Sequence, residues 1–253
     1  AVRGFSDFAG STLVHACGGA AALAGVIVLG SRAGRFSAKG EKKSMVPFAA
    51  SSIPLVTLGT FLLWFGWFGF NGFSQLAMGT FNDVNAITKI AVNTHIAGAA
   101  GTVTGAAITR LLGGKTDIIM MLNGALAGLV AITAEPLTPS PLLAIFIGAA
   151  GALIMYFGTK FLENQKLDDV VGAIPVHMFA GIFGTLVVPI SNPNTNFGTQ
   201  LLGVISVCLF SFVLSFISFK TLKQTIGLRI SKKAEKLGTD KAEVGVVAYS
   251  IRD

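Results

Sequence analysis

Apolar residues come in seven long runs along the chain. Short connectors separate the runs, and these are rich in charged residues or in Pro, Asn and Gly. A helix that crosses a bilayer needs on the order of 20 mostly apolar residues, and the runs are close to that length. We therefore predict an all-α transmembrane bundle with helices near residues 8–30, 50–73, 86–111, 117–134, 141–162, 170–190 and 198–222.

The connectors alternate in charge along the chain. The first, third and fifth connectors, with the adjoining helix ends and the C-terminal tail, hold all of the 19 Lys and Arg residues except Arg3 and Lys89. The positive-inside rule makes this side cytoplasmic, so the first helix enters from outside and the tail ends inside. The net charge of +7 then orients the protein and meets anionic lipid. It calls for no nucleic-acid partner.

Composition agrees with a membrane location. Apolar residues make up 52% of the chain and charged residues 12%, and the mean hydropathy is +0.71, values that an ordinary soluble domain does not show. Cys17 and Cys208 lie inside apolar runs and indicate small buried side chains rather than a disulfide framework. Glycines at small-xxx-small spacings predict close helix packing. The N-terminus lacks a Met and a signal-peptide layout, so we expect the sequence to begin part-way through something longer.

A few polar side chains remain near or inside the predicted helices, where an ionisable group usually faces a pathway or a partner. They are Asp7, His15, Asn71, Ser74, Lys89, His95, Asn123 and His177. The spacing of Asp7, Ser11 and His15 places them on broadly one side of the first helix. His177 lies at comparable depth in the sixth run.

Two neutral imidazoles can hydrogen-bond to each other, one ring donating and the other accepting. Such a pair would form a narrow polar line that receives a small hydrogen-bonding solute and accepts its proton. It would reject a hydrated metal ion, because it offers neither charge nor enough oxygen ligands. The alternative is that His15 and His177 each make one structural hydrogen bond between helices.

A second pattern lies in the second run, where Trp67, Phe70, Asn71 and Ser74 share one helix face. Aromatic faces attract ammonium-like cations, so the stripe suits an outer vestibule for such an ion, although aromatic stripes also serve ordinary packing. For His95 we favour a structural hydrogen bond to a neighbour or to water. Lys89 is expected to reach the membrane interface.

With these residues assembled, the chain resembles the ammonium transporter (Amt/Rh) family from its first residues to its tail. The matching motifs, in order, are DFAGSTLVH at 7–15, WFGFNGFS at 67–74, DDVVGAIPVH at 168–177 and GLR at 227–229. The resemblance implies an eleven-helix fold of two inverted five-helix repeats plus a final helix, assembled as a homotrimer with one pore per subunit. This chain corresponds to the fifth through eleventh helices, with a transmembrane domain at 1–224 and a cytoplasmic tail at 225–253.

The resemblance also implies roles for individual residues. His15 and His177 correspond to the twin pore histidines, and Phe70 to a phenylalanine of the pore gate. Ser74, with Trp67, belongs to the outer ammonium-recruitment site, while Asp7 and Asn71 support the pore from behind. The implied function is ammonium or ammonia transport in a cell (inner) membrane, without enzymatic chemistry, cofactor or metal.

Two departures from the family pattern stand out. The first four helices of the family fold have no counterpart, so we expect a partial sequence, because a pore built on inverted repeats needs both halves. Pro175 and Met178 flank His177, and they are expected to re-aim that ring and to add bulk beside it. The tail only loosely resembles the family's regulatory tail, so a PII-type signal protein is a secondary expected partner.

Other seven-helix classes fit less well. A retinal protein needs a lysine in the middle of its last helix, but Lys220 lies at the end. An intramembrane serine protease needs a Gly-x-Ser-Gly element, and the sequence contains none. Asn192-Pro193 is not the paired Asn-Pro-Ala element of an aquaporin. The serious alternative is an ammonium sensor, which would use the same fold for signalling instead of conduction.

Overall fold

The structure is a computed structural model that describes residues 4–36 and 48–248. Lys42 and Lys43 of the first basic connector, and the tail from Tyr249 onward, lie outside the described residues. The α-helices are α1 (Cys17–Leu29), α2 (Ile53–Phe73), α3 (Phe81–Gly113), α4 (Ile118–Ile132), α5 (Pro141–Asn164), α6 (Ala180–Leu186), α7 (Phe197–Thr225) and α8 (Lys232–Leu237). Three π-helical segments, η2 (Ser11–Ala16), η3 (Ile174–Phe179) and η5 (Asp240–Val244), and the 3-10 turn η4 (Val188–Ile190) complete the elements.

The seven predicted apolar runs each coincide with an apolar helical segment, which confirms the all-α prediction. Five segments are long and apolar enough to cross a membrane, namely Ser11–Leu29, Ile53–Phe73, Phe81–Gly113, Pro141–Asn164 and Phe197–Thr225. Ile118–Ile132 and Ile174–Ile190 are shorter. At 1.5 Å per residue α4 spans only about 22 Å, less than the roughly 30 Å of a hydrocarbon core.

Helix starts are set by capping side chains, and one of them moves a predicted boundary. Thr80 and Asp83 form a capping box, in which each side chain bonds the other residue's backbone N–H. The helix α3 therefore begins at Phe81, whereas the apolar pattern places its start near residue 86. As a result Lys89 lies in the third turn of α3 rather than near its outer end.

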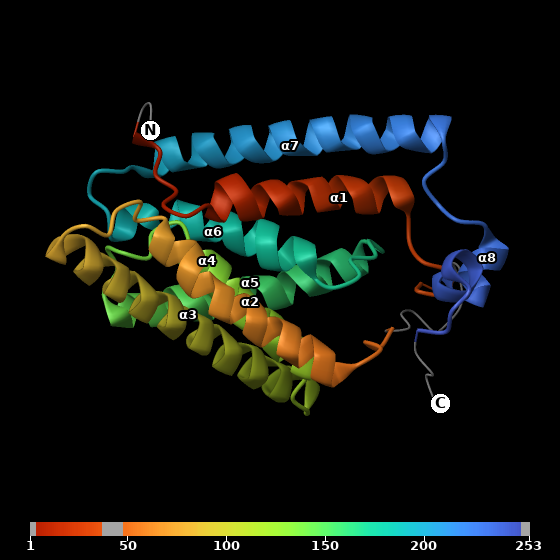
Figure 1. The fold of residues 1–253 in the computed structure, drawn as a ribbon, viewed down its shortest axis with the longest axis horizontal. Helices are drawn as coiled ribbons and strands as arrows, with labels where there is room; N and C mark the ends of the chain where they lie inside the picture. The colour runs from red at the N-terminus through yellow and green to blue at the C-terminus, as the bar shows by residue number, and fades with distance from the viewer. Residues whose placement is uncertain (1–3, 37–47, 249–253) are drawn as a thin grey trace.

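The bundle is arranged around α4, which packs between α3 and α5 and also contacts α6. The helices α1 and α7 lie side by side along one edge, whereas α2 and α3 form the opposite edge (Figure 1). The short α8 lies beyond the last residues of α1 and α7, at the end of the bundle that carries most of the Lys and Arg residues (Figure 1). We call this the basic end.

Glycine allows the close approach of α3 and α4, as predicted from small-residue spacing. A Cβ atom added to Gly101 would overlap the carbonyl oxygen of Gly124, and one added to Gly124 would lie 2.6 Å from the carbonyl oxygen of Gly101. Both distances are shorter than real side chains tolerate. Only hydrogen fits at these two positions.

Candidate functional site

The structure brings His15 and His177 together, although 162 positions separate them in the chain. Their Nδ1 atoms are 3.2 Å apart, and their rings stack with centroids 5.2 Å apart and an interplanar angle of 21°. A hydrogen bond between two Nδ1 atoms requires one ring to carry its proton there and the other to leave that nitrogen bare. The two neutral rings must therefore be opposite tautomers.

This requirement fixes what the outer nitrogens can do. The ring that donates through Nδ1 has a bare Nε2, which accepts, and the other ring has a protonated Nε2, which donates. His15 Nε2 is buried and has no hydrogen-bond partner among the described residues. The pair thus has one nitrogen, His15 Nε2, that makes no hydrogen bond to a described residue and can bond a solute.

Each histidine sits in a short π-helical segment that a carboxylate holds at its start. Asp7 Oδ2 accepts the backbone N–H groups of Thr12 and Leu13, at 2.9 and 2.7 Å. π-Helical turns are rare and occur often at functional sites. Their wider turn displaces the side chains that they carry relative to a regular helix. Asp7 therefore supports His15 from its own chain segment, without a contact to the ring.

Asp169 does the same for the other histidine, and the sequence analysis did not select it. Its carboxylate accepts the backbone N–H groups of Gly172, Ala173 and Ile174, at 3.1, 3.0 and 2.7 Å. A signal was present, because Asp169 precedes His177 by eight residues, as Asp7 precedes His15. Recognising it required a comparison of the two motifs with each other.

Aromatic rings of α2 pack against His15. Trp67 stacks on His15 with a centroid distance of 5.0 Å and an interplanar angle of 16°. Phe70 lies 5.5 Å from the same ring at 44°. Trp67 Nε1 donates to Thr133 Oγ1 at 2.9 Å, and this bond fixes the indole orientation. Trp67 and Phe70 therefore both contact His15, whereas the sequence analysis grouped Trp67 with Ser74.

Ser74 and Asn71 lie on the same helix but have other partners. Ser74 ends α2, and its hydroxyl donates to the carbonyl of Phe70 at 2.8 Å, so its oxygen can still accept from a donor. Asn71 is fully buried and donates to Thr94 Oγ1 of α3 at 3.0 Å. Asn71 thus ties α2 to α3 rather than touching the histidines.

The third histidine lies apart from the pair. His95 is exposed on α3, and its ring lies 5.5 Å from Trp64 and 6.1 Å from Phe68 of α2. Its ring contacts with α2 are aromatic. No hydrogen bond joins it to another described residue. His95 is a natural comparison residue for experiments on the pair.

Pro175 and Met178, which flank His177, lie at the start of η3 and against α1. Pro175 lies in the first turn of η3, where a missing backbone N–H leaves no helical bond broken. The segment begins at Ile174 rather than near residue 170, so Pro175 helps to start it instead of interrupting it. Met178 packs its backbone and Cβ against Gly19 of α1.

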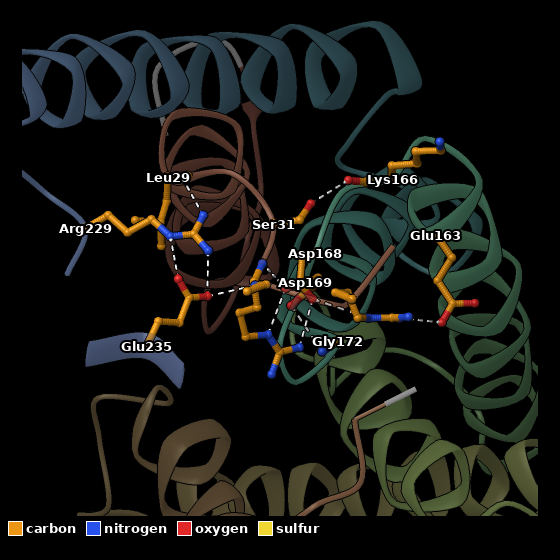
Figure 2. Close-up of polar contacts among 12 residues, drawn as sticks. Leu29, Ser31, Glu163, Lys166, Asp168, Asp169, Gly172, Arg229 and Glu235 are labelled. Carbon is orange, nitrogen blue, oxygen red and sulfur yellow. Dashed lines mark hydrogen bonds and ion pairs between the residues drawn. The ribbon is translucent and has the colours of Figure 1, made fainter. Parts of the chain in front are cut away.

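A polar cluster at the basic end joins the loop that follows α1 to the loop that precedes η3 (Figure 2). Arg32, just after α1, binds Asp168 with both its Nε and Nη2 atoms, each at 2.8 Å. Glu235 of α8 accepts from Arg229, at 2.6 Å from its Nη2 atom, and from the backbone N–H of Ala33, at 2.7 Å. The tail is thereby attached to the loop that pairs with Asp168.

Asn123, the remaining polar residue selected from the sequence, lies near this end of the bundle. Its Nδ2 donates to the carbonyl of Val171 at 3.0 Å, in the loop that leads from Asp169 to η3. In residues 4–36 and 48–248, no group of three or more His, Cys, Asp or Glu side chains could hold a metal ion.

An apolar helical bundle that holds a hydrogen-bonded histidine pair against aromatic rings has the character of a membrane transport protein. The comparisons with known proteins agree, because the Ammonium Transporter Family model matches residues 1–249. The chain belongs to the ammonium transporter family, which is a family of membrane transporters and not of enzymes.

Relatives and solved structures are similar over nearly the whole chain. Ammonium transporter Amt2 of Archaeoglobus fulgidus is 41% identical, over 97% of this chain and 55% of that protein. A putative ammonium transporter of Synechocystis is 40% identical, over 96% and 55%. The structure of a sensor Amt protein has a TM-score of 0.87 at 35% identity, over 94% of this chain and 60% of that one.

Mep2 of Candida albicans, a further solved structure, has a TM-score of 0.80 at 28% identity, over 95% of this chain and 56% of that chain. The chain thus spans about half the length of the curated relatives that it matches.

Proposed function

We propose that this protein carries ammonium or ammonia across a membrane through a narrow apolar pore lined by His15 and His177. One observation carries the proposal, namely the 3.2 Å contact between the two Nδ1 atoms. Two stacked imidazoles between apolar helices make a polar line whose nitrogens can hydrogen-bond a small solute. The neutral rings carry no fixed charge, so they cannot replace the water around a hydrated cation.

The residues around the pair suggest an order of events. The exposed ring of Phe70 offers a π face to an ammonium ion near the outer end of α2, where the Ser74 oxygen can accept one of its hydrogen bonds. Trp67 is buried and stacks on His15. The solute then meets His15, whose Nε2 has no hydrogen-bond partner in residues 4–36 and 48–248. Uptake of a proton by one ring and release of another proton from the second ring would exchange the tautomers of the pair. At any time each ring nitrogen either donates or accepts a hydrogen bond.

The wider assembly belongs to the same proposal. The expected form is a homotrimer in a cell membrane, with the basic end and the tail in the cytoplasm, as the positive-inside rule indicates. The support is the distribution of Lys and Arg and the family membership. A PII-type signal protein, if it binds, would approach the basic end, where α8 lies.

The experiment that tests the proposal is transport by the full-length protein in liposomes, for wild type and for His15→Leu, His177→Leu and His95→Leu. An ammonium gradient should produce a current or an internal pH change with wild type. Either pair variant should reduce it at least tenfold or alter its selectivity, because leucine fills the space without a hydrogen-bonding nitrogen. His95→Leu should retain transport, since His95 lies outside the pair.

Two outcomes would contradict the proposal. A trimeric, folded wild-type protein without ammonium-driven signal would exclude transport. Unchanged uptake in both His15→Leu and His177→Leu would exclude the assigned role of the pair.

A sensor is the second candidate function, and the similarity to a sensor Amt protein favours it. A sensor would bind ammonium at the same aromatic and serine residues, yet conduct it slowly and change the state of its tail. Binding of methylammonium to the reconstituted protein without transport, accompanied by altered protease access to the α8 region, would support sensing over transport.

A further inference from the structure

Gln200, in the first turn of α7, is a polar residue that is fully buried. Burial of a carboxamide is costly unless its donors and its acceptor are hydrogen-bonded. Gln200 Oε1 accepts the backbone N–H of Ser6 at 2.8 Å, and Nε2 donates to the carbonyl of Ser6 at 2.6 Å and to that of Thr185 at 2.9 Å. Both donors and the acceptor of the amide are therefore in use, and Gln200 joins two separate segments to α7.

The first of these segments leads to His15. Ser6 immediately precedes Asp7, whose carboxylate accepts backbone N–H groups of η2, the segment that carries His15. Ser6 is bonded to Gln200 through both its N–H and its carbonyl, so Gln200 fixes the place at which this stretch meets α7. The position of Asp7, and with it the start of η2, depends on that place.

The second segment follows His177. Thr185 lies in α6, which continues directly from η3, the segment that carries His177. The hydroxyl oxygens of Thr185 and of Thr12 in η2 are 2.6 Å apart, and both residues are fully buried. One turn earlier in α6, a Cβ atom added to Gly181 would overlap the carbonyl oxygen of Ser11. The two histidine-bearing stretches are thus joined by a buried polar cluster, which we call the outer node and which consists of Thr12, Thr185 and Gln200.

The contact between the two histidine rings is sensitive to the placement of these stretches. The Nδ1 atoms of His15 and His177 are 3.2 Å apart, at the long end of the usual range of about 2.7–3.2 Å for a hydrogen bond from an N–H group. A small movement of η2 away from α6 would therefore break this bond. The outer node holds the backbones of the two stretches together, so its hydrogen bonds limit such a movement.

We propose that Gln200 is a positioning residue for the pore, which holds Ser6 and Thr185 in place and so sets the separation of His15 and His177. This inference rests on the proposed function and deepens it, because the separation of the rings then decides which solute passes. Ammonium or ammonia can pass rings that are in contact, whereas the additional methyl group of methylammonium requires them to move apart. Gln200 acts through the backbones of η2 and α6 and not through contact with the rings.

The test is uptake of ammonium and of methylammonium by the full-length protein in liposomes, for wild type and for Gln200→Met. Methionine is of similar size but has neither the N–H donors nor the carbonyl acceptor of the amide. Because a close-fitting site distinguishes one carbon atom by about tenfold or more, a loosened pair should raise the ratio of methylammonium to ammonium uptake roughly threefold or more. A loss of folded protein alone would lower both rates together and leave their ratio unchanged.

A second measurement does not depend on transport. Nitrogen NMR of full-length protein with isotopically labelled histidine detects the coupling across the hydrogen bond between the two Nδ1 atoms. Wild type should show this coupling, and Gln200→Met should weaken or abolish it. If wild type shows the coupling but no transport, the proposed function fails, whereas loss of the coupling in Gln200→Met still supports the positioning role.

Asn93→Leu is the matched control. Asn93 of α3 is also a fully buried carboxamide, and its Nδ2 donates to the backbone carbonyls of Pro136 and Pro139, each at 2.9 Å. The substitution therefore removes buried hydrogen bonds of the same kind outside the outer node. It should retain the wild-type uptake ratio and the coupling between the histidines.

Two variants of Thr185 test the outer node if Gln200→Met fails to fold. Thr185→Val removes the hydroxyl that meets Thr12 and keeps the side-chain shape, so it should change the uptake ratio and the coupling in the same direction as Gln200→Met. Thr185→Ser keeps the hydroxyl and should behave as wild type.

Three results would overturn the proposal. The first is an unchanged uptake ratio and coupling in Gln200→Met, or in Thr185→Val if only that variant folds. The second is an equal change in Asn93→Leu, which would assign the effect to any lost buried hydrogen bond. The third is the same change in Thr185→Ser as in Thr185→Val, which would assign it to packing volume.

Discussion

Asp7 and Asp169 are equivalent at the level of single residues, although they lie in different halves of the chain. Each stands eight residues before a histidine, and each accepts backbone N–H groups of the π-helical segment that carries that histidine. The first N–H groups of a helix lack internal partners, so a carboxylate there stabilises the start of the segment. Both rings are positioned in this way through the backbone.

We expect Asp169→Ala to lower the free energy of unfolding by about 1–2 kcal/mol, the usual cost of a lost helix cap. Transport per folded protein should also fall, which a loss of stability alone would not cause. Asp169→Asn keeps one acceptor oxygen and should fall between wild type and alanine. Methylammonium uptake, normalised to folded protein, measures the effect. Asp117→Ala, which removes the cap of α4, is the control. Equal loss of uptake in both alanine variants would contradict a positioning role for Asp169.

At the level of elements, the contact of α3 with α4 sets how closely the core helices pack. The two helices meet at Gly101 and Gly124, and the carbonyl oxygen of each faces the Cα of the other. Lipid offers little hydrophobic driving force for helix association, so close backbone contact carries much of the packing energy. The short α4 depends on this contact, because it lies between its neighbours.

Gly101→Ala should therefore destabilise the bundle by about 1–3 kcal/mol, as overpacking of a tight contact does. The new methyl group would meet backbone atoms, which cannot rotate away. Gly59→Ala is the matched change, since a Cβ at Gly59 of α2 meets nothing within 4 Å, and it should be neutral or slightly stabilising. Thermal unfolding in detergent measures the melting temperature of both variants. Equal melting temperatures would show that α3 and α4 can separate without cost.

At the scale of the whole molecule, the cluster around Asp168 connects the first described helix, the sixth apolar segment and the tail (Figure 2). Burial raises the pKa of Asp168, but the hydrogen bonds and charge of Arg32 lower this pKa by a larger amount. The net pKa of Asp168 therefore lies below the ordinary 3.8. The pKa of Glu235 also lies below its ordinary 4.5, chiefly because Arg229 donates to its carboxylate.

A carboxylate with a lowered pKa stabilises the folded state above its ordinary pKa and loses that contribution as the pH falls through its folded-state pKa. The Asp168 contribution should therefore be fully present at neutral pH and disappear below pH 3.8. Wild type should melt at a higher temperature than Asp168→Asn at neutral pH, and the difference should shrink as the pH falls below 3.8. A difference that stays constant with pH would exclude this linkage.

The amino-acid sequence alone determined the number of apolar helical segments, because hydropathy is a local property of each run. It also indicated the family, since the motifs around His15, Trp67 and His177 are contiguous. The capping box of Thr80 and Asp83 is visible in the sequence as well, but the apolar pattern outweighed it and placed the start of α3 too late.

The tertiary structure alone decided which polar groups meet. The contact of His15 with His177 joins residues from two distant segments, and the stacking of Trp67 on His15 rather than beside Ser74 depends on how α2 packs. The same holds for the cluster at the basic end. Hydropathy and capping act over one or two helical turns, whereas hydrogen bonds across the bundle depend on the helix packing that places their partners within about 3 Å.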